Sequence, residues 1–188
     1  MTKRLFVAVK IRPSSKLFSV HKKLQLTLKS DKIKWVNPDN FHLTLKFLGE
    51  ADEDLLPEII SKIINLLEKI NRFNLTLKGF GRFYTRKRTK VIWLGIDDQN
   101  NQLSIIAKKL NQSLDLLGFK PEQKTFKAHL TVGRVKFIEN ERALSDFMNT
   151  YSNQKFQEIT IDEIILFESV LKSTGPIYNC LNVFKLKD

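Results

Sequence analysis

The chain of 188 residues is long enough for one domain, or for two small lobes packed together, and it can bury a core without a partner. Its 42% hydrophobic and 28% charged residues are ordinary values for a folded protein and exclude a disordered chain. A formal net charge of +12 and a pI near 9.8 favour an anionic partner such as nucleic acid or its fragments, although a lysine-rich proteome would give the same balance.

The single cysteine, Cys180, excludes an intrachain disulfide and predicts a reducing, cytoplasmic setting. No cationic and then apolar leader opens the chain, and no run of about eighteen apolar residues suits a membrane span. No heptad pattern indicates an interface either. We therefore expect a monomer without an obligatory protein partner.

In the first half of the chain, apolar periodicity and turn residues predict strands and helices in alternation. The expected elements are a strand at 4–11, a helix within 13–30, a short strand before a turn at 37–40, a strand at 41–48 and a helix at 54–70.

The second half repeats this order. The expected elements are strands at 73–78 and 91–96 with a basic loop at 82–90 between them, a helix at 101–117, a strand at 129–135, a helix at 140–148, and strands at 159–167 and 177–186. Each half therefore holds strands and helices around one His-Leu-Thr strand. We expect an α+β fold of two similar lobes of antiparallel sheet, with outer helices, around a central cleft. The whole chain, residues 1–188, is expected to form one domain.

Two of the three histidines stand in the same setting, "FHLTLKFLGE" at 41–50 and "AHLTVGRVKF" at 128–137. Side chains alternate along a strand, so His42 shares a face with Thr44 and Lys46. His129 likewise shares a face with Thr131. Either histidine alone would be a half-buried residue bonded to the backbone, but together they predict an acid and a base on the floor of one groove.

Metal chemistry is not expected, because the sequence holds neither His-Glu-x-x-His nor a cysteine pair. No other cofactor is expected. Arg134 follows His129 by five residues and would point away on a regular strand. A bulge at Gly133 would turn its guanidinium toward a phosphate, and a surface arginine at the strand end is the alternative.

Several other side chains have competing interpretations. Phe83 lies in the basic stretch, where an aromatic ring suits RNA bases, although a solvated hairpin tip is equally compatible with the pattern. Trp93 is expected in the core, because it sits in an apolar strand. His21 is expected on the surface, and Cys180 is expected to be a buried thiol.

These motifs carry a family resemblance over nearly the whole chain. "RLFVAVKI", "WVNPDNFHLTLKFLGE", "VIWLGI", "LGF", "FKAHLTVGRVK" and "IILFESVL" occur in order. The chain resembles the 2H phosphoesterases, specifically the LigT-like bacterial and archaeal RNA 2',3'-cyclic phosphodiesterases once called 2'-5' RNA ligases. Ala128 stands where proline is more usual in that group.

The resemblance implies a bilobal α+β fold with one His-x-Thr motif from each lobe. It implies metal-independent opening of 2',3'-cyclic phosphates on RNA 3' ends or nucleotides, which leaves a 2'-phosphate. His42 and His129 match the catalytic pair, Thr44 and Thr131 the motif threonines, and Arg134 a basic residue that holds phosphate. Lys46 is expected to join Thr44, Thr131 and Arg134 in stabilising the charge on the phosphoryl oxygens. Cleavage or sealing of 2'-5' linkages, and noncatalytic binding of RNA ends, are the alternatives.

Overall fold

In the computed structural model, which describes residues 1–85, 88–122, 124–173 and 175–188, nine strands form two antiparallel sheets. The four-stranded sheet has the order β3-β1-β8-β9, from β1 (Thr2–Lys10), β3 (His42–Asp52), β8 (Glu163–Lys172) and β9 (Gly175–Lys185). The five-stranded sheet has the order β2-β6-β5-β4-β7, from β2 (Lys32–Trp35), β4 (Phe73–Thr85), β5 (Arg88–Asp97), β6 (His129–Phe137) and β7 (Lys155–Ile161).

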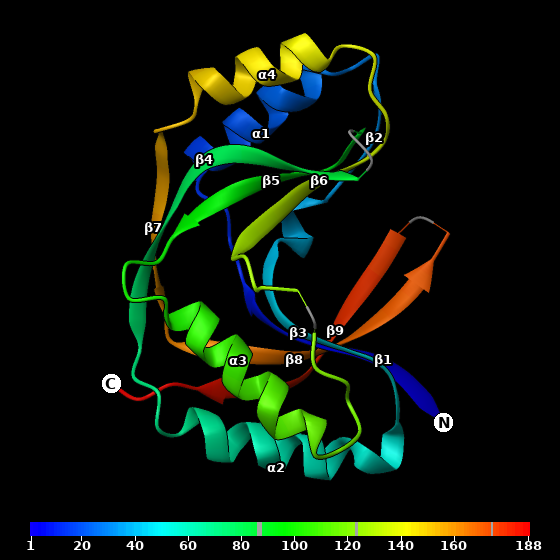
Figure 1. Ribbon diagram of the computed structural model, residues 1–188, viewed down its shortest axis with the longest axis vertical. Helices are drawn as coiled ribbons and strands as arrows, with labels where there is room; N and C mark the ends of the chain where they lie inside the picture. Colours follow the sequence, from blue (N-terminus) through cyan, green and yellow to red (C-terminus); the bar gives the residue numbers. More distant parts are fainter. Residues whose placement is uncertain (86–87, 123, 174) are drawn as a thin grey trace.

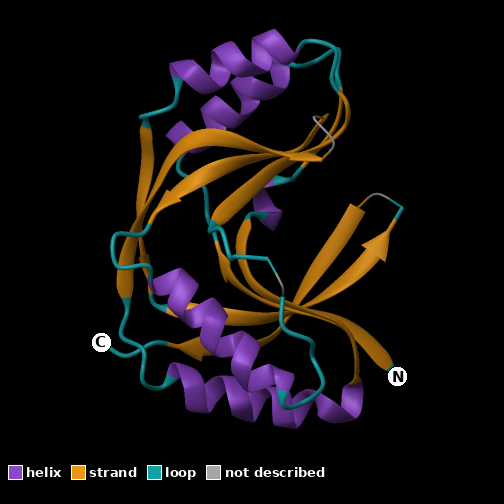
Figure 2. Ribbon diagram, viewed as in Figure 1, coloured by secondary structure: helices purple, strands orange, loops and turns teal. Residues whose placement is uncertain are grey.

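Each sheet carries helices on its outer side, and together they form two lobes (Figures 1 and 2). In the first lobe, α2 (Leu56–Leu67) and α3 (Gln102–Asp115) lie together against the four-stranded sheet. In the second lobe, α1 (Ser15–Thr27) and α4 (Glu141–Thr150) lie together against the five-stranded sheet. The expected α+β fold of two sheet lobes with outer helices is thus confirmed.

The lobes are interleaved and do not correspond to the two halves of the sequence. Helix α1 follows β1 of the first lobe but packs in the second, and α3 follows β5 of the second lobe but packs in the first. The strand expected at 159–167 is two strands in different sheets, separated only by Asp162. A single ordinary residue leaves no glycine or proline signal by which the sequence could mark this boundary.

The strands on either side of the predicted basic loop are longer than expected. β4 continues to Thr85 and β5 begins at Arg88, so most of residues 82–90 belong to a hairpin rather than to a loop. Residues 86 and 87 at its tip lie outside the described residues. The side chain of Arg82 pairs with Glu141 of α4, which also accepts a hydrogen bond from the buried Thr89.

The main cluster of buried side chains includes members of both sheets and of the helices that cover them. Helix α2 shows the pattern clearly, because Ile59, Ile63 and Leu67 recur every fourth residue and are all buried. Each such side chain stabilises the fold by about 1.5–3 kcal/mol. None of the helices among the described residues is long and apolar enough to cross a membrane.

Candidate active site

In both His-Leu-Thr strands, half-buried polar side chains alternate with buried apolar ones. In β3, His42 and Thr44 are half-buried while Leu43 is 1% exposed; in β6, His129 and Thr131 are half-buried while Leu130 is fully buried. β3 is an edge strand of the first lobe, and β6 lies inside the sheet of the second lobe. The structure therefore has one His-Thr pair on each sheet, in the arrangement that the sequence predicts.

The two rings are held by the same hydrogen bond. Nδ1 of His42 lies 2.7 Å from the carbonyl oxygen of Asn40, and Nδ1 of His129 lies 2.6 Å from the carbonyl oxygen of Lys127. A carbonyl oxygen only accepts, so Nδ1 carries the proton in both rings. Nε2 of each neutral ring is then left with a free lone pair, which suits a proton acceptor or, once protonated, a donor.

Burial lowers the pKa of both histidines, and their bonds to the backbone carbonyls only partly offset this effect. The positive charge of Arg134 lowers both pKa values further, and His42 is also affected by Lys10 and by His129. β3 and β6 contact each other across the two sheets, and Arg134 is near enough to act on both imidazoles. The lowered pKa values make both imidazoles harder to protonate than a histidine in water.

Arg134 reaches this site because β6 contains a bulge. Trp93 of β5 pairs with Thr131 while Ile92 pairs with Gly133, so Val132 is the extra residue. The predicted bulge, which reverses the face to which the following side chains point, is confirmed, although the extra residue is Val132 rather than Gly133. Arg134 is thereby returned to the face of His129.

Lys46 does not lie on this face, and the prediction that it lines the groove beside His42 is wrong. β3 also has a bulge, since Ala8 pairs with Thr44 while Val7 pairs with Lys46, so Leu45 is extra. Lys46 is 1% exposed, and its Nζ donates a hydrogen bond to the carbonyl oxygen of Lys120 at 2.7 Å. Burial lowers the pKa of this ammonium group, while Glu122 and Asp115 act in the opposite direction.

The same bulge brings Phe47 to the face of His42, where the sequence placed Lys46. Phe47 is 48% exposed, and its ring lies 5.8 Å from that of Phe6, which itself lies 5.0 Å from the His42 ring. Tyr178 of β9 completes this aromatic setting with an edge contact to His42 at 5.1 Å. Sequence reasoning missed these three aromatic residues, although Phe6 stands between Leu5 and Val7, which are fully buried in the main core.

Aromatic rings also surround His129. Phe83 makes an edge contact with the imidazole at 4.8 Å, and Trp93 lies 6.5 Å from it. Phe83 therefore lies beside His129, and its role in substrate binding stays a prediction. Trp93 is not a core residue as predicted: it is half-buried, and it lines a pocket beside His129.

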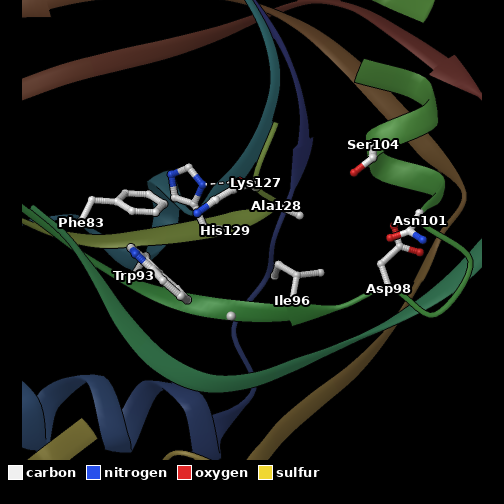
Figure 3. A pocket seen from close by; sticks show the side chains of 10 residues that line it. Phe83, Trp93, Ile96, Asp98, Asn101, Ser104, Lys127, Ala128 and His129 are labelled. Carbon is white, nitrogen blue, oxygen red and sulfur yellow. Dashed lines mark hydrogen bonds between the residues drawn. The ribbon is translucent and has the colours of Figure 1, made fainter. Parts of the chain in front are cut away.

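That pocket has a volume of about 330 Å³ and lies between β5, the start of α3 and the Lys127–His129 segment. Figure 3 shows Phe83, Trp93 and His129 on one side of it and Asp98, Asn101 and Ser104 on the other. The polar side of the pocket corresponds to the run "DDQNN" at 97–101 in the sequence. Such a run before a helix is typical of a turn, so by itself it does not indicate a binding site.

Two further expectations are wrong. His21 is buried at 2% exposure, with Nε2 3.3 Å from the carbonyl oxygen of Val132 and edge contacts to Trp35 and Phe41. It faces inward from α1, because the apolar stripe of that helix passes through it. Cys180 is exposed and not buried, because it lies in the middle of β9, an edge strand of the four-stranded sheet whose side chains are mostly not buried.

No group of three or more His, Cys, Asp and Glu side chains suited to a metal ion is found within the described ranges. The groups that the two histidine strands present on the histidine faces include two imidazoles, one guanidinium and two hydroxyl groups. Two sheets that each present a histidine and a threonine to one arginine define the two-histidine class of phosphoesterase.

Comparison with known proteins gives the family. The family model described as LigT like Phosphoesterase matches residues 9–93 and again residues 94–178. The chain is 39% identical over 178 residues to the RNA 2',3'-cyclic phosphodiesterase of Methanocaldococcus jannaschii, covering 95% of this chain and 98% of that protein. It is 35% identical over 186 residues to the protein of the same name from Archaeoglobus fulgidus, covering 97% and 99%. The chain belongs to the LigT-like phosphoesterase family.

Solved structures agree with this fold. The protein TT0787 of Thermus thermophilus superposes with a TM-score of 0.79 at 26% identity, over 98% of both chains. E. coli LigT complexed with 3'-AMP superposes with a TM-score of 0.76 at 20% identity, over 100% of both chains. At that identity the second likeness concerns the fold alone.

Proposed function

We propose that this protein is an RNA 2',3'-cyclic phosphodiesterase, which opens a terminal cyclic phosphate to a 2'-phosphomonoester by acid and base catalysis. The observation that carries the proposal is the pair of imidazoles, each fixed through Nδ1 with Nε2 free, around one arginine. Relatives that bear this name match the chain over nearly its whole length, which supports the choice of substrate.

In the reaction, Nε2 of His129 takes a proton from water as the water oxygen bonds to phosphorus. The bond between phosphorus and O3' breaks, and protonated Nε2 of His42 gives its proton to the departing O3'. Strain in the five-membered cyclic diester activates this leaving group. General acid and base catalysis of this kind contributes about 10²–10⁴-fold for each proton transfer.

Negative charge grows on the two non-bridging phosphoryl oxygens during this step. Arg134 and the hydroxyl groups of Thr44 and Thr131 are the donors that we assign to these oxygens, because all three are on the faces of the two histidines. Loss of one such fixed donor typically costs about 10²–10³-fold in rate. The substrate anion also raises the pKa of the nearby imidazoles, which allows His42 to be protonated in the complex.

We assign the whole chain to one domain of two pseudo-symmetric lobes. The family model matches two consecutive segments, each of which contributes one His-x-Thr strand to a different sheet, and the buried cluster joins both sheets. Its partners are RNA 3' ends or nucleotides that carry the cyclic phosphate, and Phe83 stacks on part of the substrate. We assign no metal or cofactor. The protein acts as a monomer in the cytoplasm, where its single exposed cysteine stays reduced.

Two other functions use the same site. The acid and base can run in reverse and seal a 2'-5' linkage, but excess water favours hydrolysis. A noncatalytic module would bind RNA ends without turnover, using the same arginine and aromatic rings.

One experiment separates these functions. A short oligoribonucleotide with a 3'-terminal 2',3'-cyclic phosphate is incubated with the protein in EDTA, and the products are resolved by chromatography and phosphorus NMR. Conversion to the 2'-phosphate that is lost in His42→Ala and His129→Ala supports the proposal. Binding without turnover would leave the noncatalytic module, and activity that disappears in EDTA and returns with added zinc or manganese would contradict the acid and base mechanism.

A further inference from the structure

The pocket that His129 lines extends beyond the residues assigned to the phosphoryl chemistry. It has two unlike walls, and Figure 3 shows them on opposite sides of the space. Phe83 and Trp93 form an aromatic wall next to the imidazole, whereas Asp98, Asn101 and Ser104 form a polar wall at the start of α3. Its volume of about 330 Å³ lies in the range of small-molecule sites, about 300–1,000 Å³.

The aromatic wall is held rigidly. A Cβ atom added at Gly81 would lie 2.2 Å from the Trp93 ring, so the indole rests directly on the backbone of β4. Phe83 contacts the same indole at 5.3 Å and the imidazole of His129 at 4.8 Å. A ring fixed in this way offers a flat surface on which a nucleobase can stack without ordering a loose side chain.

The polar wall is rich in acceptors. Oδ2 of Asp98 accepts a hydrogen bond from the backbone N–H of Leu103 at 2.8 Å, which fixes the carboxylate at the helix start. Oδ1 of that carboxylate remains to accept from a ligand, and an ionised carboxylate has no donor. Ser104 and Asn101 lie beside it and can each accept or donate, so Asp98 is the member of this wall that only accepts.

We propose that this pocket binds the nucleobase of the nucleotide that carries the cyclic phosphate, and that it prefers guanine. Guanine presents two neighbouring donors, N1–H and the N2 amino group, on one edge. Adenine and cytosine place an acceptor nitrogen beside their amino group, and uracil flanks its N3–H with two carbonyl oxygens, which a carboxylate repels. The assignment rests on the proposed function, because the cyclic phosphate beside His129 places the base.

The test compares kcat/KM for the four nucleoside 2',3'-cyclic monophosphates. The wild-type protein should prefer the guanosine substrate by about 5- to 150-fold, which is the range for one good pair of hydrogen bonds to a base. In Asp98→Asn, the amide oxygen still caps α3 while an NH₂ group replaces the free acceptor. This variant should lose the preference for guanosine and keep most of its activity on uridine 2',3'-cyclic phosphate.

Asp97→Asn is the matched control, because it removes the same charge from the neighbouring residue, which does not line the pocket. It should keep the guanosine preference. Equal kcat/KM for all four bases in the wild-type protein would overturn the proposal, and so would an unchanged preference in Asp98→Asn.

Calorimetric binding of the four nucleoside 2'-monophosphates distinguishes failure of the pocket from failure of the function. Selective binding of guanosine 2'-monophosphate that is lost in Asp98→Asn supports the pocket even if no cyclic phosphate is hydrolysed. Hydrolysis of all four substrates with equal binding would leave the phosphodiesterase activity in place and refute the pocket.

Discussion

Gly81→Ala is the substitution that tests most directly how the fold supports the site. The added Cβ would meet three atoms of the Trp93 ring, at 2.2, 2.3 and 2.7 Å, whereas ordinary contacts begin at 3.4 Å. The indole must therefore move by about 1.2 Å, the amount by which the shortest of these contacts falls below that limit. Phe83 and His129 are aromatic neighbours of this indole, with ring centroids at 5.3 and 6.5 Å, so a shift of the indole disturbs the setting of His129.

Two magnitudes follow from this shift. Overpacking of this kind costs about 1–3 kcal/mol of the free energy of unfolding. For a chain of this size, that loss lowers the melting temperature by about 2–12 °C. A displacement of about 1 Å beside a reacting group can cost as much as 10²-fold in rate, so kcat/KM should fall by about 10- to 100-fold.

The assay combines thermal unfolding with hydrolysis of a nucleoside 2',3'-cyclic phosphate. Gly118→Ala is the control, because Gly118 has φ +86° and no atom within 4 Å of an added Cβ. It should lose about 1–2 kcal/mol through backbone strain alone and keep wild-type kcat/KM. If Gly81→Ala were destabilised but equally active, the packing of Trp93 would not support the site.

Three other results are expected. On a diester whose nitrophenyl oxygen replaces O3', His42→Ala should recover much of its lost rate and His129→Ala should not, because a stable leaving group needs no acid; equal recovery in both variants would reject this division of roles. The pH profile of kcat/KM reports the pKa values of the free enzyme, and burial lowers those of His42 and His129. The maximum of this profile should therefore lie below pH 6.5. A maximum above pH 7 would contradict the argument from burial. Burial also lowers the pKa of His21, so as the pH falls below 6.5 the unfolded chain binds a proton at this residue before the folded chain does. The free energy of unfolding should therefore fall less steeply with decreasing pH in His21→Gln than in the wild-type protein. Equal slopes in the two proteins would show that His21 does not contribute to this pH dependence.

The strand alternation of the two motifs could be predicted because it is local. His42 and Thr44, like His129 and Thr131, share a face by strand geometry alone. The prediction failed for Lys46 because a bulge depends on the neighbouring strand, and the extra residue Leu45 is set by pairing with β1. Pairing with another strand of this kind cannot be predicted from the sequence of β3 alone.

Burial of isolated polar residues was equally hard to predict. His21 stands among lysines, which suggested a solvated helix face, but its ring packs between Trp35 and Phe41. These contacts exist because α1 crosses to the five-stranded sheet, whereas the sequence suggested that it covers its own half. The pocket beside His129 was missed for the same reason, since β5, α3 and the Lys127–His129 segment converge only in the folded chain.

The similarity between the two histidine strands extends beyond their His-x-Thr motifs. Each histidine strand takes one extra residue after its threonine, so the residue five positions after each histidine returns to the histidine face. That residue is the exposed Phe47 in the first lobe and Arg134 in the second. Equivalent backbones thus place an aromatic ring on one side of the site and a cation on the other.

The placement of the two histidines on separate sheets suits the proposed chemistry. In phosphoryl transfer the attacking and leaving oxygens lie roughly in line, on opposite sides of phosphorus. One imidazole must therefore reach the water and the other must reach O3', which a single strand carrying both histidines would not achieve. Because both rings are fixed by the same Nδ1 bond, the free site itself does not distinguish acid from base. In the proposed mechanism the bound substrate makes that distinction, since the ring beside O3' becomes the acid and the ring beside the water becomes the base.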